Sequence, residues 1–281
     1  MKTDDPLQII ITGTSSGIGR ALAQSLMLSG HQVWGIARTP QKNDACNGKG
    51  LFRSSQCDVS SWDALNAVAE IVSREWGKVD AVIACAGSHG EIGQALAASL
   101  MAWSETIQSN LVGSFFTVRS FYPLLQKAAR RAKVVCFSGG GATKARPYFS
   151  AYGVAKTGIV RLVETIAIEE KGKPFDINAV APGAINTRLT DEIIARGASV
   201  VGESEYQATV KQKQNGGASI EKLQKLIDWL LSSASDGITG RLISAQWDNW
   251  ASFGKNSSSL STESDIYTLR RILPEERGMR M

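Results

Sequence analysis

The regular alternation of short β-branched runs with longer amphipathic ones limits the folds open to this chain more than any other feature. Five segments carry apolar residues at helical spacing: 17–30, 60–77, 99 to about 130, 151–170 and 219–234. Between them lie runs that we expect to be strands: 7–12, 32–37, 51–57, 80–85, 132–137, 175–180 and 240–245. Strands joined by helical crossovers form a parallel sheet covered on both faces. The sequence therefore predicts an α/β fold with a doubly wound, seven-stranded parallel sheet and helices on both faces.

Length and composition narrow the class of protein. At 281 residues and 43% hydrophobic content, the chain can bury one large core, and residues 1–245 are expected to form a single domain. No apolar run approaches the length of a membrane span, and acidic residues precede the first strand, so we expect a cytoplasmic protein with no membrane partner. The net charge of +5 is spread along the chain, which gives no support for a nucleic-acid partner.

The cysteines and two unusual segments complete this survey. The four cysteines show no C-x-x-C pairing, which favours reduced, partly buried thiols and predicts no metal site. Residues 190–217 form a long polar insertion, which is either a substrate lid or a plain surface excursion. Residues 246–281 form a polar and aromatic C-terminal extension. We expect 257–264 to be mobile, and Trp247, Trp250, Tyr267 and Leu269 to pack against the rest of the protein.

The sequence TGTSSGIG, residues 12–19, directly follows the first expected strand and opens the first expected helix. Glycine at 13, 17 and 19 allows a tight turn and a close approach of the backbone to a pyrophosphate, whose charge the N–H groups at the helix start favour. A tight turn without a ligand is the alternative. The position between strand and helix favours a nucleotide site.

Tyr152 and Lys156 are four residues apart near the start of an expected helix and therefore share one of its faces. A phenol with an ordinary pKa is a poor base at neutral pH, but a nearby ammonium group favours the phenolate. The pair then suits proton transfer, with Tyr152 as the acid and base. An ordinary surface pair is the alternative interpretation.

The glycine motif and the downstream Y-x-x-x-K together resemble the classical branch of the short-chain dehydrogenase/reductase family, over roughly residues 7–245. The resemblance implies a Rossmann-type, NAD(P)-binding domain that moves a hydride between a nicotinamide and a ketone or secondary alcohol. It implies Asn110, Ser138, Tyr152 and Lys156 as catalytic residues, with Lys156 also holding the nicotinamide ribose. The implied cofactor-binding residues are Gly13, Ser15, Ser16, Gly17, Ile18, Gly19, Arg38, Asp58, Val59, Cys85, Ala86, Gly87, Tyr152, Lys156, Pro182, Gly183, Ile185 and Thr187.

The chain departs from the family pattern at two places. Ala84 and Cys85 stand where the family usually has two asparagines, and Gly139 stands where it has the serine that polarises the carbonyl group. Ser138 is one residue earlier. Either the glycine-rich loop absorbs the shift, or Ser138 has a structural role and the hydroxyl donor is missing. We expect the shift.

Cofactor choice follows from charge at the end of the second expected strand. NAD-specific relatives have a ribose-binding carboxylate there, whereas this chain has Ala37 followed by Arg38. An arginine favours a 2′-phosphate, so we expect NADP(H) to be preferred over NAD(H). The alternative is that Arg38 is a solvated charge, and Ser16 occupies the place of a second basic residue common in the family.

The predicted function is an NADPH-dependent oxidoreductase acting on a small-molecule carbonyl or alcohol, such as a sugar-like or cyclic compound. The family resemblance further implies a homodimer or homotetramer. Two alternatives stay open: a redox-inactive NADP-binding sensor or scaffold, and a dehydratase or epimerase that uses the same site. We expect His31 to face solvent, and His89 to be a loop histidine without a role.

Overall fold

The computed structural model describes residues 6–41, 44–46, 50–253, 260 and 264–279, with no side-chain description for 44–46. These residues contain one sheet of eight strands in the order β3-β4-β2-β1-β5-β6-β7-β8. Seven strands are parallel, as predicted, and β3 is an additional antiparallel edge strand. The strands are β1 (Gln8–Thr12), β2 (Gln32–Ala37), β3 (Asp44–Cys46), β4 (Gly50–Gln56), β5 (Ala81–Ala84), β6 (Ala132–Phe137), β7 (Phe175–Ala181) and β8 (Leu242–Ser244).

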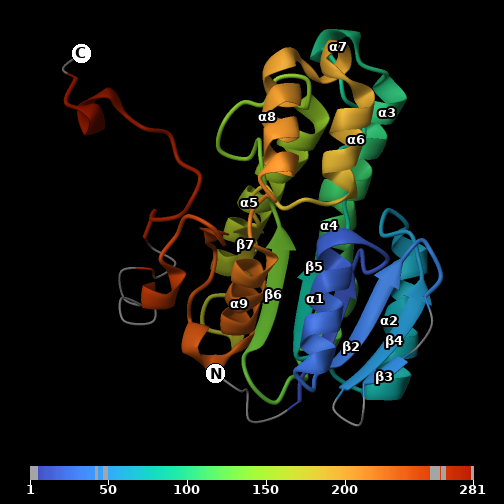
Figure 1. The fold of residues 1–281 in the computed structure, drawn as a ribbon. Coiled ribbons are helices and arrows are strands. Elements are labelled where there is room, and N and C mark those ends of the chain that lie inside the picture. The colour runs from blue at the N-terminus through green and yellow to red at the C-terminus, as the bar shows by residue number, and fades with distance from the viewer. Residues whose placement is uncertain (1–5, 42–43, 47–49, 254–259, 261–263, 280–281) are drawn as a thin grey trace.

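Helices cover both faces of the sheet, which confirms the doubly wound fold (Figure 1). One core layer packs α2, α4 and α5 on the sheet, and the other packs α1 and α9. The helices are α1 (Gly17–Leu28), α2 (Trp62–Trp76), α3 (Leu100–Ile107), α4 (Gly113–Leu125), α5 (Ser150–Glu169), α6 (Arg188–Arg196), α7 (Ala198–Val201), α8 (Glu203–Gln214) and α9 (Ile220–Leu231). In the described part of the chain, no helix is long and apolar enough to cross a membrane.

The strand order reverses direction between β1 and β5. In open α/β sheets, ligands bind beyond the carboxyl ends of the strands at such a reversal. The glycine motif follows β1 and the loop Ala84–Gly87 follows β5, so the sheet topology brings both to this point. Helices α6, α7 and α8 lie beyond the same edge of the sheet (Figure 1).

The helix expected from residue 99 to about 130 is interrupted. Helices α3 and α4 are joined by a π-helical turn, Gln108–Val112, that contains Asn110. Asn110 Nδ2 donates a hydrogen bond to the Thr106 carbonyl oxygen (2.9 Å), and Ser114 Oγ donates to the Asn110 carbonyl oxygen (2.6 Å). Because a π-helical turn lies inside a helix, the helical pattern of apolar residues continues on both sides of it, and the sequence does not reveal the interruption. Such turns are often found at functional positions.

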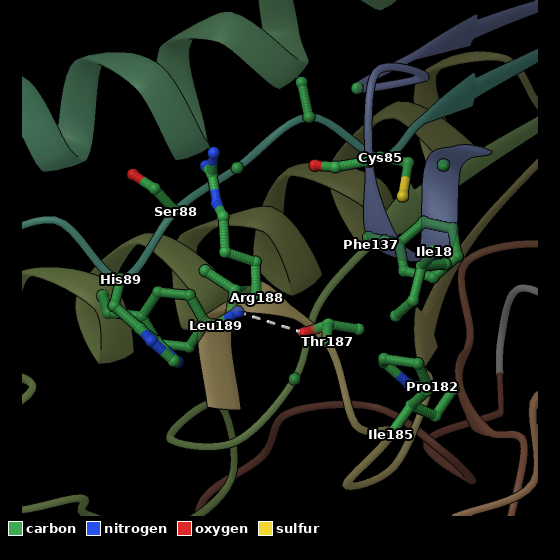
Figure 2. A pocket seen from close by; sticks show the side chains of 18 of the residues that line it. Ile18, Cys85, Ser88, His89, Phe137, Pro182, Ile185, Thr187, Arg188 and Leu189 are labelled. Carbon is green, nitrogen blue, oxygen red and sulfur yellow. Dashed lines mark hydrogen bonds between the residues drawn. The ribbon is translucent and has the colours of Figure 1, made fainter. Parts of the chain in front are cut away.

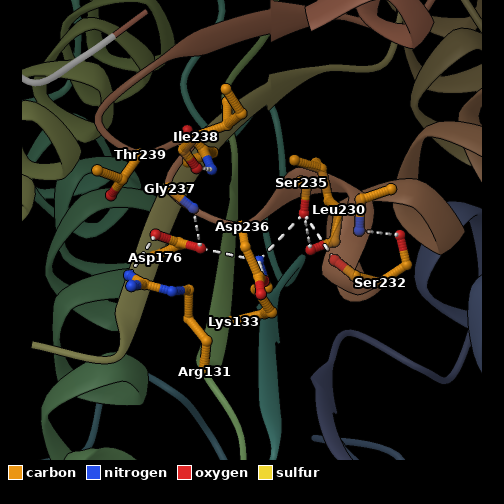
Figure 3. A network of polar contacts seen from close by, with 12 residues as sticks. Arg131, Lys133, Asp176, Leu230, Ser232, Ser235, Asp236, Gly237, Ile238 and Thr239 are labelled. Carbon is orange, nitrogen blue, oxygen red and sulfur yellow. Dashed lines mark hydrogen bonds and ion pairs between the residues drawn. The ribbon is translucent and has the colours of Figure 1, made fainter. Parts of the chain in front are cut away.

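At the opposite end of the strands, a partly buried ion-pair cluster joins β6, β7 and the turn before β8 (Figure 3). Lys133 Nζ lies 2.8 Å from Asp176 Oδ2 and 2.7 Å from Asp236 Oδ1, and it also donates to Ser235 Oγ (3.1 Å). Arg131 Nη1 makes a second ion pair with Asp176 (3.2 Å). Because every charge in the cluster has a partner, the cost of burying Lys133 and Asp176 is offset.

His31 does not face solvent, and the expectation that it would is wrong. Its side chain is buried, and Nδ1 accepts a hydrogen bond from the Leu7 backbone N–H (3.1 Å). Burial, followed by the charge of Arg130, lowers the pKa of His31. The turn before β2 was the reason to expect exposure, but Leu7, directly before β1, contacts His31 in that turn through this hydrogen bond.

We expect the protein to lose stability on mild acidification. His31 and His89 are the chain's two histidines, and both have depressed pKa values in the folded state. Below about pH 6.5 the unfolded chain therefore binds protons that the folded protein does not. The free energy of unfolding should fall by about 1.4 kcal/mol per pH unit for each histidine that stays neutral. Denaturant unfolding at pH 7.5 and 5.5 measures this, and equal values would contradict it.

The C-terminal extension packs on the domain through three of the four expected residues. Trp250 and Tyr267 contact the core layer that contains α9, and Leu269 contacts the layer that contains α5. Trp247, by contrast, is 87% exposed, because it lies on the rim of the cavity described below. The expectation of mobility for 257–264 concerns residues that, apart from Leu260 and Ser264, lie outside the described part of the chain.

Candidate active site

The glycine loop after β1 has the geometry that its sequence predicts. Gly13 and Gly17 have φ angles of +80° and +56°, which L side chains rarely adopt. A Cβ added to Gly19 would lie 2.4 Å from the Gly13 carbonyl oxygen, and one added to Gly13 would lie 2.9 Å from Ala86 Cα. The backbone is thus packed tightly against the loop after β5, and it leaves the N-terminus of α1 open toward a ligand.

The loop Ala84–Gly87 keeps its place although the two usual asparagines are absent. Thr12 Oγ1 accepts hydrogen bonds from the backbone N–H groups of Cys85 and Ala86, both at 3.1 Å. Burial raises the pKa of the Cys85 thiol to about 12, which keeps it protonated and unreactive. Cys57 and Cys136 are also free thiols and are buried.

A cavity of about 600 Å³ opens beyond the carboxyl ends of the strands. Figure 2 shows part of its wall, in which Thr187 Oγ1 accepts a hydrogen bond from the Leu189 N–H (3.3 Å) and thereby starts α6. The structure gathers every predicted site residue except Asn110 into this wall: Gly13, Ser15, Ser16, Gly17, Ile18, Gly19, Arg38, Asp58, Val59, Cys85, Ala86, Gly87, Ser138, Tyr152, Lys156, Pro182, Gly183, Ile185 and Thr187.

Asn110 lies behind the wall and is fully buried. Its Oδ1 accepts from the Ser88 N–H (3.3 Å) and its Nδ2 donates to the Ser88 carbonyl oxygen (3.0 Å). A Cβ added to Gly87 would lie 2.6 Å from Asn110 Oδ1 and 3.5 Å from Lys156 Nζ. Asn110 therefore fixes the backbone of the loop after β5 beside Lys156.

Tyr152 and Lys156 project from the first turns of α5, and both side chains are buried. Lys156 Nζ donates to the Phe137 carbonyl oxygen (2.9 Å) and lies 5.4 Å from the centre of the Tyr152 ring. Burial lowers the pKa of Lys156 to about 8. Burial also raises the pKa of Tyr152, although Arg146 acts to lower it. Without a cofactor, the phenol is thus protonated at neutral pH, which is the form that can donate a proton.

Ser138 and Gly139 differ in what they present to Tyr152. Ser138 Oγ is buried and donates its hydrogen to the Lys156 carbonyl oxygen in α5 (3.0 Å). A Cβ added to Gly139 would lie 3.3 Å from the Tyr152 hydroxyl oxygen. Position 139 therefore faces the phenol, and the single hydrogen of Ser138 is held within the protein.

Arg38 follows β2 at the rim of the cavity, where its side chain is exposed. Its carbonyl oxygen accepts a hydrogen bond from Gln56 Nε2 (3.0 Å), which fixes the backbone at this point. The glycine cradle and the open start of α1 fit the pyrophosphate of a dinucleotide, and Arg38 places a positive charge at the rim of the same cavity.

The model of the short chain dehydrogenase family matches residues 8–197. The chain belongs to the short-chain dehydrogenase family. The match confirms the predicted family and the predicted class of enzyme, an NAD(P)-dependent oxidoreductase.

Curated relatives and solved structures agree with this assignment. A 3-ketodihydrosphingosine reductase of Bacteroides thetaiotaomicron is 32% identical over 190 residues. The matched residues make up 66% of each chain, which is slightly less than two thirds. A 3-oxoacyl-(acyl-carrier-protein) reductase of Escherichia coli (strain K12) is 26% identical over 240 residues, 83% of this chain and 93% of that one. The structure of actinorhodin polyketide ketoreductase with NADPH, 20% identical, has the same fold, with a TM-score of 0.73 over 87% of this chain and 97% of that one.

In this short-chain dehydrogenase, residues 190–217 are mostly helical and include most of α6 with all of α7 and α8. The expected insertion contributes five residues to the cavity wall: Thr190, Ile193, Glu205, Thr209 and Gln212. Arg146 Nη2 lies 2.5 Å from Glu205 Oε1 and joins the loop after β6 to α8. The Arg146 guanidinium also lies 3.8 Å from the centre of the Phe149 ring.

Sequence reasoning missed three side chains at the site of the short-chain dehydrogenase: Arg146, Glu205 and Gln41. Gln41 Nε2 donates to the Thr14 carbonyl oxygen (2.9 Å), and its Oε1 accepts from Thr14 Oγ1 (2.5 Å), which supports the glycine loop. No local motif marks any of the three, because each reaches the site through a contact distant in sequence.

His89, which follows the loop after β5 near the expected site, also lies in the cavity wall. Its imidazole is buried between two rings, with its centre 5.0 Å from that of Tyr152 and 5.3 Å from that of Phe149. Burial, followed by the charges of Arg146 and Lys156, lowers the pKa of His89 to about 3.

Proposed function

We propose that the protein is a cytoplasmic, NADPH-dependent reductase of a small-molecule ketone that also catalyses the reverse oxidation of the secondary alcohol. The observation that carries this proposal is the burial of Tyr152 and Lys156 in the same cavity as the glycine cradle. A ketone bound beside Tyr152 is within reach of both a proton donor and the nicotinamide end of a dinucleotide.

Each residue then has a role in binding or proton transfer. When bound, the cofactor supplies a hydride to the carbonyl carbon. Tyr152 gives its proton to the carbonyl oxygen, and the Lys156 ammonium group favours the resulting phenolate. Lys156 also holds the nicotinamide ribose, and Asn110 keeps the adjoining backbone in place.

The remaining wall residues each bind a different part of the dinucleotide. Residues of the glycine motif bind the pyrophosphate, Asp58 and Val59 hold the adenine, and the loop from Pro182 to Thr187 faces the nicotinamide. Arg38 pairs with the 2′-phosphate, which makes NADPH the preferred cofactor.

The substrate lies between the loop after β6 and helices α6 and α8, which act as its lid. Polar side chains dominate this part of the wall, with Arg146, Glu205, Thr209 and Gln212 at the cavity. Such a surface suits a substrate with several oxygens, such as a sugar-like or cyclic hydroxyketone. The family membership supports a homodimer or homotetramer as the assembly.

The test is NADPH consumption, followed by absorbance, with three probe ketones: L-erythrulose, a 3-ketosteroid and acetoacetyl-coenzyme A. NADH and a Tyr152→Phe variant are run in parallel. Turnover that needs Tyr152 supports the reductase, and deuterium transfer from labelled NADPH into the product separates it from a dehydratase or epimerase. Fractions of a metabolite extract are assayed in the same way. If the protein binds NADPH but turns over no probe ketone and no fraction, a redox-inactive sensor is favoured.

We expect reduction to slow above about pH 8. Both Tyr152 and Lys156 act in their protonated forms, and Lys156 has the lower pKa of the two, about 8. Loss of its proton removes the charge that stabilises the phenolate, so kcat should be level from pH 6 to 7 and decline as the pH rises through the Lys156 pKa. A pH profile of kcat measures this. A Lys156→Arg variant should keep whatever activity it has to a higher pH, and a wild-type profile level to pH 9.5 would contradict the assignment.

A further inference from the structure

At the site of the proposed reductase, position 139 has no side chain that could contact a substrate beside Tyr152. The inference drawn from this rests on the proposed function. A side chain there would begin 3.3 Å from the Tyr152 hydroxyl oxygen, yet the residue is glycine. Ser138 does not fill the gap, because its hydroxyl donates to the Lys156 carbonyl oxygen. A second hydrogen-bond donor beside Tyr152 would stabilise an oxyanion that develops there.

His89 is a polar side chain that lies against the Tyr152 ring from the loop after β5, with the two ring centres 5.0 Å apart. The imidazole is 5% exposed, and Nδ1 is shielded from solvent without a hydrogen-bond partner among the described residues. A buried polar atom without a partner is rare in native proteins and calls for a specific explanation. Figure 2 shows the imidazole among the side chains that line the cavity.

Burial keeps His89 neutral, and the nearby charges of Arg146 and Lys156 add to this effect by lowering its pKa further. The ring therefore carries one N–H donor and one acceptor at working pH. A neutral donor can bind a ketone oxygen and strengthen its contact as negative charge develops there. Histidine can therefore donate a hydrogen bond here, as a serine hydroxyl does.

We propose that His89 is a catalytic residue that donates its imidazole N–H to the reacting carbonyl oxygen of the substrate and replaces the side chain that Gly139 lacks. Tyr152 and His89 then hold the same oxygen, and Tyr152 alone transfers a proton to it. The contact is stronger in the transition state than in the bound ketone, so its loss should appear in kcat.

His89→Phe is the first variant to measure, because phenylalanine keeps the ring against Tyr152 and Phe149 but has no N–H group. With the probe ketone that the wild type reduces best, kcat should fall about a hundredfold or more, with KM changed less than threefold. The dissociation constant for NADPH should be unchanged. Adding Gly139→Ser to His89→Phe should raise kcat at least tenfold above that of His89→Phe, because a hydroxyl group then faces the carbonyl oxygen of the substrate.

Gly139→Ser in the otherwise wild-type enzyme is the second variant, and it does not depend on whether His89→Phe folds. If His89 already supplies the contact, the added serine should raise kcat less than threefold. A tenfold gain would overturn the proposal, as would a His89→Phe enzyme within threefold of wild type, or a loss confined to KM. If the wild type reduces no probe faster than Tyr152→Phe, the reductase assignment fails, and the role of His89 fails with it.

Discussion

A Tyr152→Phe variant is expected to reduce ketones about a thousandfold more slowly than the wild type while binding NADPH equally well. Positioned acid and base groups contribute about 10²- to 10⁴-fold to rate, and here the phenol is both the proton donor and a hydrogen-bond donor to the carbonyl oxygen. Phenylalanine fills the same volume against His89 and Phe149. The substitution should therefore lower kcat and leave the site folded.

The measurement is single-turnover reduction of the best probe ketone, with NADPH affinity determined by fluorescence. Tyr148→Phe is the matched control, since Tyr148 lies four residues earlier, packs on Gly202 of the α7–α8 turn, and is not in the cavity wall. It should stay within about twofold of wild type. Equal losses in the two variants would show that the hydroxyl of Tyr152 is not the proton donor.

An Arg38→Asp variant is expected to reverse the cofactor preference. A hydrogen bond to a charged group contributes about 1.5–3 kcal/mol, so losing the arginine should lower kcat/KM with NADPH about 10- to 100-fold. The new carboxylate adds repulsion toward the 2′-phosphate and accepts the ribose hydroxyls of NADH. Together these effects should shift the ratio of the two kcat/KM values about a thousandfold.

The ratio of kcat/KM for NADPH to that for NADH, measured with one ketone at fixed ionic strength, tests this. Arg74→Asp makes the same change of charge on the exposed surface of α2 and should leave the ratio unchanged. A wild-type enzyme with no preference, or a variant with an unchanged ratio, would show that Arg38 is only a solvated charge.

Most of the fold could be predicted from the sequence, because burial on both faces of a parallel sheet requires continuous apolar runs. The seven parallel strands follow such runs to within a few residues. Strand β3 could not be found in this way, since Asp44–Cys46 is three residues long and pairs at the sheet edge through its backbone. The exposure of His31 was misjudged for a related reason, since a contact from before β1 buries it.

The cofactor half of the candidate site was predictable to a greater extent than the substrate half. Residues such as Gly13 and Arg38 follow strand ends directly, so their place in the sheet fixes their place in the site. Arg146 and Glu205 meet across 59 residues of sequence, which no periodicity encodes. The direction of the Ser138 hydroxyl depends on the backbone conformation directly after β6. Only the three-dimensional structure shows that this hydroxyl points toward α5.

The family match ends at residue 197, one residue after the end of α6 and directly before the segment that contains α7 and α8. This segment contributes no strand to the sheet, yet it carries Glu205, Thr209 and Gln212 into the cavity. Descendants of one ancestral gene could therefore exchange this segment and acquire new substrates while inheriting the sheet, the proton donor and the cofactor cradle unchanged. The same separation makes 198–217 the region to randomise when an altered substrate range is sought by directed evolution.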